Sequence, residues 1–99
     1  MGVVHAKRPR YRQEEVDSRV LAWRLFAKRY PDFVYVLTFH MKERFGVTPE
    51  EAIRRPRDFH RMLSELVGEG NARYVERVIE ETAAREGIIV IIRRPPDLL

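Results

Sequence analysis

Side chains that could catalyse a reaction or bind a metal are few in this sequence, and they lie far apart. His40 and Glu43 are three residues apart, the spacing of half a carboxylate–histidine metal site on a helix, and no matching second half follows. Neither serine has around it the glycine-rich turn that presents a nucleophile. The absence of cysteine excludes thiolate chemistry and disulfides. The sequence therefore predicts a protein that is not an enzyme and that binds neither metal nor cofactor.

Basic side chains are the second group with a chemical use, and they are concentrated at the N-terminus. The net charge is +4, and residues 1–12 carry all of it, because the acids and bases of the remaining residues balance. These side chains could neutralise phosphates, an aromatic ring could stack on a base, and Pro9 favours an extended arm. The alternative is a solvated terminus that only aids solubility. The candidate residues of the arm are Lys7, Arg8, Arg10, Tyr11 and Arg12.

A second arginine-rich stretch, "RRPRDFHR" at residues 54–61, lies where two helices are expected to meet. The residues after Pro56 begin a helix, and the free backbone amides of a helix N-terminus favour anions. The alternative pairs Arg61 with Glu65, one helical turn later, and leaves the other arginines solvated. The candidate residues are Arg54, Arg55, Arg57 and Arg61. Together with the arm, this junction makes DNA or RNA the expected partner.

The elements that must position these residues are mostly helical. Residues 13–30 carry an apolar stripe at helical spacing that stops before Pro31. Residues 33–39 are rich in aromatic and β-branched side chains, which favour a strand. Asp32 as an N-cap, Gly46 as a terminator and the length between them favour a helix instead. We expect the helix.

Clearer signals mark the helices that follow. "TPEEAIRR" combines Thr48 as N-cap with Glu51 at the capping-box position. A longer helix begins at Pro56, and another, with Asn71 as its N-cap, ends before Gly87. The sequence therefore predicts a mainly α fold, a compact bundle of four to five helices with a short C-terminal β-strand.

Two capping motifs in this region resemble those of a known group of proteins. A phenylalanine–glycine turn precedes a proline-capped helix in "RFGVTPEEAI", and a glycine–acid–glycine junction follows in "LVGEGNA". Over residues 39–83 the chain resembles small archaeal proteins of unknown function, which implies a helical fold and no activity. The excess of arginine over lysine, with one Asn and one Gln, indicates a heat-adapted source or GC-rich codons.

The chain continues with five consecutive β-branched residues, Ile88 to Ile92, followed by two arginines and two prolines. We expect a short strand, because proline cannot continue a sheet ladder. Its partner would be either the N-terminal segment, residues 2–6, or the same segment of a second copy. A continuation of the preceding helix is the third possibility. The expected organisation is a basic arm at 1–12, a helical domain at 13–87, and a short strand and proline-terminated tail at 88–99.

Apolar side chains beyond those of a single core predict self-association. Leu21 and Leu25 lie on the side of the first helix away from its apolar stripe, where they make either an internal contact or a partner surface. The residues expected to mediate a homo-oligomer are Leu21, Leu25, Ile88, Val90 and Ile92. No apolar run approaches a membrane span, so we expect a cytoplasmic protein with no membrane partner. The leading hypothesis is nucleic-acid association, and the alternative is a homo-oligomeric protein-interaction module.

Overall fold

Five helices form the part of the chain that the structure describes. The computed structural model describes the backbone of residues 2–92 and the side chains of residues 14–92. The helices are α1 (Gly2–Arg29), α2 (Pro31–Phe45), α3 (Pro49–Ala52), α4 (Pro56–Val67) and α5 (Glu69–Arg85). The prediction of a mainly α fold is confirmed. The proline-terminated tail, residues 93–99, lies outside the described residues.

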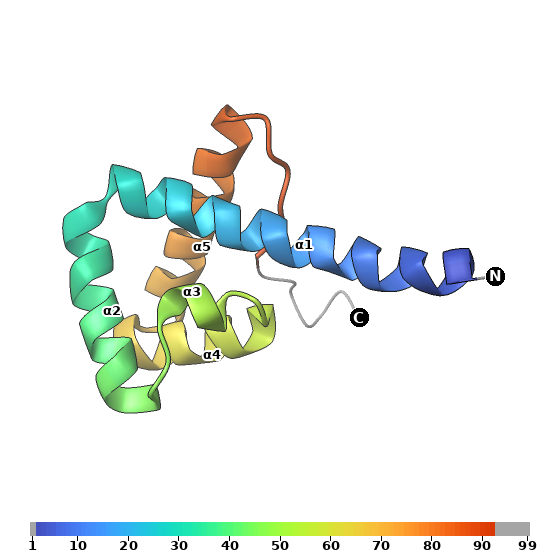
Figure 1. Ribbon diagram of the computed structural model, residues 1–99. Helices are drawn as coiled ribbons and strands as arrows, with labels where there is room; N and C mark the ends of the chain where they lie inside the picture. The colour runs from blue at the N-terminus through green and yellow to red at the C-terminus, as the bar shows by residue number, and fades with distance from the viewer. Residues whose placement is uncertain (1, 93–99) are drawn as a thin grey trace.

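Helix α1 is longer than the sequence predicted. It begins at Gly2, so the extended arm expected before a helix at residue 13 is wrong. The fixed φ of proline is a helical value, so the chain can continue through Pro9 although the carbonyl of His5 loses its usual donor. With 28 residues, α1 is about 42 Å long. Figure 1 shows its N-terminal half projecting beyond the other helices.

Helix α2 settles the ambiguous stretch in favour of a helix. It ends at Gly46, which has a left-handed φ of 75° and donates its N–H to the carbonyl of Lys42. The predicted N-cap, Asp32, is wrong by two residues, because the cap is Tyr30. The reason is Pro31, which is preferred at the first helical position and moves the start forward. Asp32 then lies in the first turn, where its charge favours the helix dipole.

The predicted capping box of α3 is confirmed. The hydroxyl of Thr48 accepts a hydrogen bond from the N–H of Glu51 at 3.2 Å, and the carboxylate of Glu51 accepts one from the N–H of Thr48 at 3.0 Å. Ile53, directly after α3, is fully buried and anchors the turn to α4. On α4, Phe59 and Leu63 point into the core as their spacing predicts.

Helix α5 begins earlier than predicted. Its N-cap is Gly68, with a φ of 92°, and its first residue is Glu69. Asn71 is therefore not the N-cap, and its side-chain amide donates to the carbonyl of Val67 at 2.9 Å. Gly68 allows the chain to turn sharply between α4 and α5, because glycine tolerates a positive φ. Helix α5 then packs against both α1 and α4.

The chain turns back after α5 through a Schellman motif. Ile88 donates its N–H to the carbonyl of Ala83, and Gly87, with a φ of 82°, donates to the carbonyl of Ala84. This turn ends the helix, so the hypothesis of a helical continuation is wrong. No strand forms within residues 2–92, and the N-terminal segment expected to pair with Ile88–Ile92 is part of α1. The N–H of Ile92 donates instead to the carboxylate of Glu80 at 2.9 Å.

The core lies where α1, α4 and α5 meet. The ring centroid of Trp23 lies 5.4 Å from that of Phe26 and 6.1 Å from that of Phe59, which packs edge-on. Ile79 of α5 and Ile92 of the returning chain are also fully buried. Three helices and the last described segment therefore share one core, which holds the α3–α4 turn in place beside α1.

Candidate nucleic-acid interface

Arg19 of α1 hydrogen-bonds directly to the α3–α4 turn. The Nε of Arg19 donates to the carbonyl of Ile53 at 3.1 Å, and its Nη2 donates to the carbonyl of Arg54 at 3.0 Å. Partial burial lowers the pKa of Arg19, although the nearby carboxylate of Glu15 acts in the opposite direction. Two carbonyls of the turn thus accept hydrogen bonds from one planar guanidinium, which gives the turn a defined position.

The four predicted arginines of the turn are all exposed. Within the described residues, Arg55 and Arg57 make no ion pair. Arg54 lies near enough to Glu50 to lower its pKa, although the hydrogen bond from Arg24 is the larger cause. Arg61, the fourth, is held loosely, 3.8 Å from Asp58 and 3.9 Å from Glu65. The turn therefore presents positive charge that its own neighbours neutralise only in part.

Two positions of the N-terminal arm lie in line with Arg19 along the helical backbone of α1. Positions 8 and 12 precede Arg19 by eleven and seven residues, so all three fall on one line along an α-helix. At Arg19 that line faces the α3–α4 turn. Positions 7 and 10 lie on other sides of the helix. The arm side chains, those of Lys7, Arg8, Arg10, Tyr11 and Arg12, lie outside the described residues.

The residues predicted for self-association are only partly accessible. Leu21 is 44% exposed, and Leu25 is half-buried beside Thr82 of α5 and Glu86, the residue directly after it. Ile92 is buried, and Ile88 and Val90 are half-buried against the core. The residues between them, Ile89 and Ile91, point outward and are 84% and 60% exposed. The segment thus has the alternation of a one-sided strand.

A polar cluster between α4 and α5 was not predicted from the sequence. The Nδ1 of His60 lies 2.9 Å from a carboxylate oxygen of Glu76, whose side chain is buried. On the other side of the ring, Nε2 lies 3.3 Å from the carboxylate of Glu69 and 3.4 Å from the hydroxyl of Ser64. The hydroxyl of Ser64, the imidazole of His60 and the carboxylate of Glu76 lie in the order of the catalytic groups of some hydrolases. The carboxylate of Glu69, however, contacts the same ring nitrogen as the hydroxyl of Ser64. The cluster joins the two helices. Its sequence signal was a glutamate, Glu76, within the inward stripe of α5.

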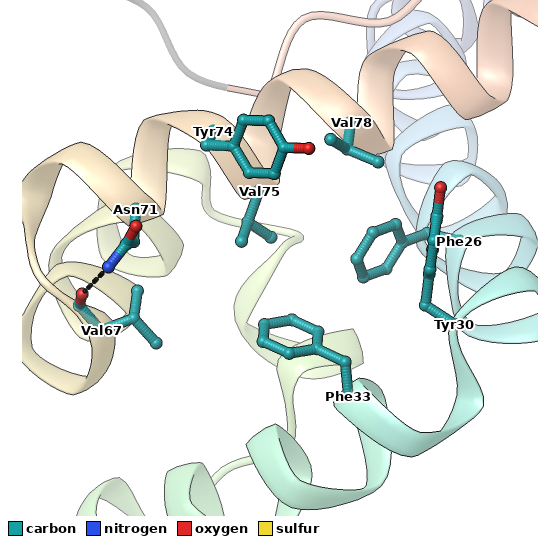
Figure 2. A pocket seen from close by; sticks show the side chains of 8 residues that line it. All are labelled: Phe26, Tyr30, Phe33, Val67, Asn71, Tyr74, Val75 and Val78. Carbon is teal, nitrogen blue, oxygen red and sulfur yellow. Dashed lines mark hydrogen bonds between the residues drawn. The ribbon is translucent and has the colours of Figure 1, made fainter.

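An apolar cavity of about 340 Å³ lies between the α1–α2 corner and α5. Figure 2 shows three aromatic side chains on one side of it facing α5 on the other. The amide of Asn71 is occupied by the carbonyl of Val67. The cavity is lined by Phe26, Tyr30, Phe33, Val67, Asn71, Tyr74, Val75 and Val78. It provides apolar contacts but little that would orient a ligand.

Comparison with protein-family models, with curated proteins and with solved structures finds no match for this chain. The resemblance of residues 39–83 to archaeal proteins therefore rests on the sequence motifs alone. Across the described residues, no three His, Asp or Glu side chains are grouped so that they could hold a metal ion. None of the helices in this part of the chain is long and apolar enough to cross a bilayer.

Proposed function

We propose that this protein associates with the phosphate backbone of nucleic acid through one face, formed by the N-terminal half of α1 and the α3–α4 turn. The observation that carries the proposal is the pair of hydrogen bonds from Arg19 to the carbonyls of Ile53 and Arg54. These bonds hold the turn, with its exposed arginines, beside Arg19. Positions 8 and 12 lie further towards the N-terminus on the same side of the α1 backbone. On this proposal, positions 8 and 12 act together with the arginines of the turn, although the two are far apart in the sequence.

Electrostatics supports this face. Its arginines include Arg55 and Arg57, which make no ion pair within the described residues and so keep their charge available. Neutralising phosphates releases condensed counterions, which drives sequence-independent binding. The first turn of α1 holds no acidic side chain, and the positive end of the helix dipole there also favours anions. Both effects favour an anionic partner.

The second candidate function is protein contact through self-association, and the outward isoleucines favour it. Within the described residues, the N–H groups of Ile89, Val90 and Ile91 have no hydrogen-bond partner. An exposed β-branched segment with free backbone groups is a template for strand pairing with a second copy. Replacing Ile91 by Lys should abolish such pairing.

The test of the leading proposal is a fluorescence-anisotropy titration of labelled duplex DNA, single-stranded DNA and structured RNA at low salt. Arg55→Gln/Arg57→Gln, which removes two charges from the turn, should weaken binding on the order of tenfold or more. The matched control, Arg77→Gln/Arg85→Gln, removes two exposed arginines of α5 and should change affinity much less. Equal losses in the two variants would mean that net charge, and not this face, determines binding.

A further inference from the structure

Helix α2 carries apolar side chains on the side turned away from the core. Tyr35 is 77% exposed, Phe39 57% and Val36 52%, whereas Leu37 and Met41 on the opposite side are buried. The three exposed residues lie within one helical turn of each other on the same side, since Tyr35 and Phe39 are four residues apart. A contiguous exposed apolar patch of a few hundred Å² is often functional.

A groove follows this side of α2 and extends to α1. Tyr35, Thr38, Phe39 and Lys42 line it from α2, and Ala27 lines it from α1. The residues of α2 that line the groove are three or four positions apart. Residues at this spacing form a ridge along a helix, against which a neighbouring helix can pack. Figure 1 shows α2 at one end of the described body, away from the projecting end of α1. A partner could reach this groove without contacting the basic face.

Two charges at the ends of this surface are unpaired within the described residues. Asp32 lies in the first turn of α2 and Lys42 in the last, and both are exposed. Neither side chain makes an ion pair with another described residue. An antiparallel helix with the same charge order would set acid against base at both ends of the contact.

We propose that α2 docks against α2 of a second copy, antiparallel and around a two-fold axis that crosses the exposed side of the helix at the height of position 37. In this register Asp32 opposes Lys42 of the second copy, because both positions lie five residues from the axis. The same register opposes Tyr35 with Phe39 of the second copy, two residues from the axis on either side. One alignment therefore satisfies the charge pairs and the aromatic pairs together, each of them twice.

The exposed apolar side chains of α2 supply part of the area that a dimer needs. An aromatic side chain covers about 150–250 Å², so burying the exposed parts of Tyr35, Phe39 and Val36 removes on the order of 300 Å² per copy from water. Stable interfaces bury about 1,200–2,000 Å² in total. These side chains supply about half of that minimum, and the lining of the groove must supply the rest. The dimer is therefore expected to dissociate on dilution.

Sedimentation velocity over a wide range of protein concentrations tests the dimer. The wild-type chain should shift from monomer to dimer as its concentration rises, and Phe39→Glu should remain monomeric. Tyr74→Glu is the matched control, because it places the same charge at an aromatic residue of α5 that is 68% exposed and lies outside the groove. A wild-type chain that stays monomeric overturns the proposal. So does a dimer that Phe39→Glu leaves intact and Ile91→Lys disrupts.

A charge exchange tests the antiparallel register. Asp32→Lys should weaken the dimer by placing two lysines opposite each other, and Lys42→Asp should weaken it by placing two acids together. The double variant, Asp32→Lys/Lys42→Asp, restores opposite charges at both ends and should recover most of the wild-type dimer. Circular dichroism should show unchanged helix content in all three. Failure of the double variant to recover, with the fold intact, overturns the register.

Discussion

The Nδ1 nitrogen of His60 lies 2.9 Å from one carboxylate oxygen of Glu76 and 3.0 Å from the other. The side chain of Glu76 is 2% exposed, so this contact places a carboxylate inside the interface between α4 and α5. A buried carboxylate is stabilised by such a partner and is costly without it. This pair is therefore a point at which the stability of the fold can be tested without touching either proposed surface.

His60→Ala should lower the free energy of unfolding by about 2 kcal/mol, because it removes one hydrogen-bonding partner from a buried carboxylate. His60→Leu/Glu76→Met should recover most of that loss, since apolar side chains of similar volume can replace a buried polar pair. Urea unfolding measures both. A single variant as stable as the wild type would show that His60 contributes little to holding Glu76.

The ion pair between Arg24 and Glu50 joins α1 to α3 and predicts a pH dependence. Hydrogen bonds from Arg24 at 2.9 and 3.2 Å lower the pKa of Glu50 below its ordinary value of 4.5. The folded state therefore binds fewer protons than the unfolded state, and the contribution is complete above pH 4.5 and lost as the pH falls through the folded pKa. Because the pair is partly exposed, we expect less than about 1 kcal/mol.

Unfolding measured between neutral and acid pH checks this. Glu50→Gln and Arg24→Gln should each remove the same part of the acid-induced loss of stability, because each removes one partner of the pair. A Glu50→Gln profile that runs parallel to the wild-type profile would contradict the assignment.

Two glycines give opposite predictions for the same substitution. Gly87 has a φ of 82° in the Schellman turn, whereas Gly70 has ordinary helical geometry within α5. An added Cβ meets no atom within 4 Å at either position, so the backbone alone decides. Gly87→Ala should destabilise the fold by about 1–2 kcal/mol. Gly70→Ala should stabilise it by about 0.5–1 kcal/mol, and denaturant midpoints will separate the two.

Local signals in the sequence predicted the helices well, because capping is local chemistry. Thr48 with Glu51 and Gly46 after α2 act on backbone groups within a few residues of themselves. The start of α1 was missed because Pro9 lies inside the helix, and proline usually indicates that a helix does not continue through it. No strand forms at Ile88–Ile92 within the described residues, where the segment is held by burial against the core and by a hydrogen bond to Glu80. Pairing with a second copy stays a prediction.

The candidate site depended on tertiary structure that no local signal contains. The arginines after α3 were identified from their types, but their position beside α1 is set by Arg19 across more than thirty residues. The exposed side of α2 was missed for a related reason. Its aromatic residues have the composition of a core helix, and the sequence could not show that Tyr35 and Phe39 face away from the core.

The salt dependence of binding to duplex DNA tests the central claim most directly. If positions 8 and 12 act with Arg54, Arg55 and Arg57, about five phosphate contacts predict a log–log slope of about −4.5. Arg8→Gln/Arg12→Gln should make the slope shallower by about 2, because two contacts are lost. Lys7→Gln/Arg10→Gln removes the same charge from other sides of α1 and should leave the slope nearly unchanged. Absence of binding at low salt, or equal changes in the two double variants, would contradict a nucleic-acid-binding face built from α1 and the α3–α4 turn.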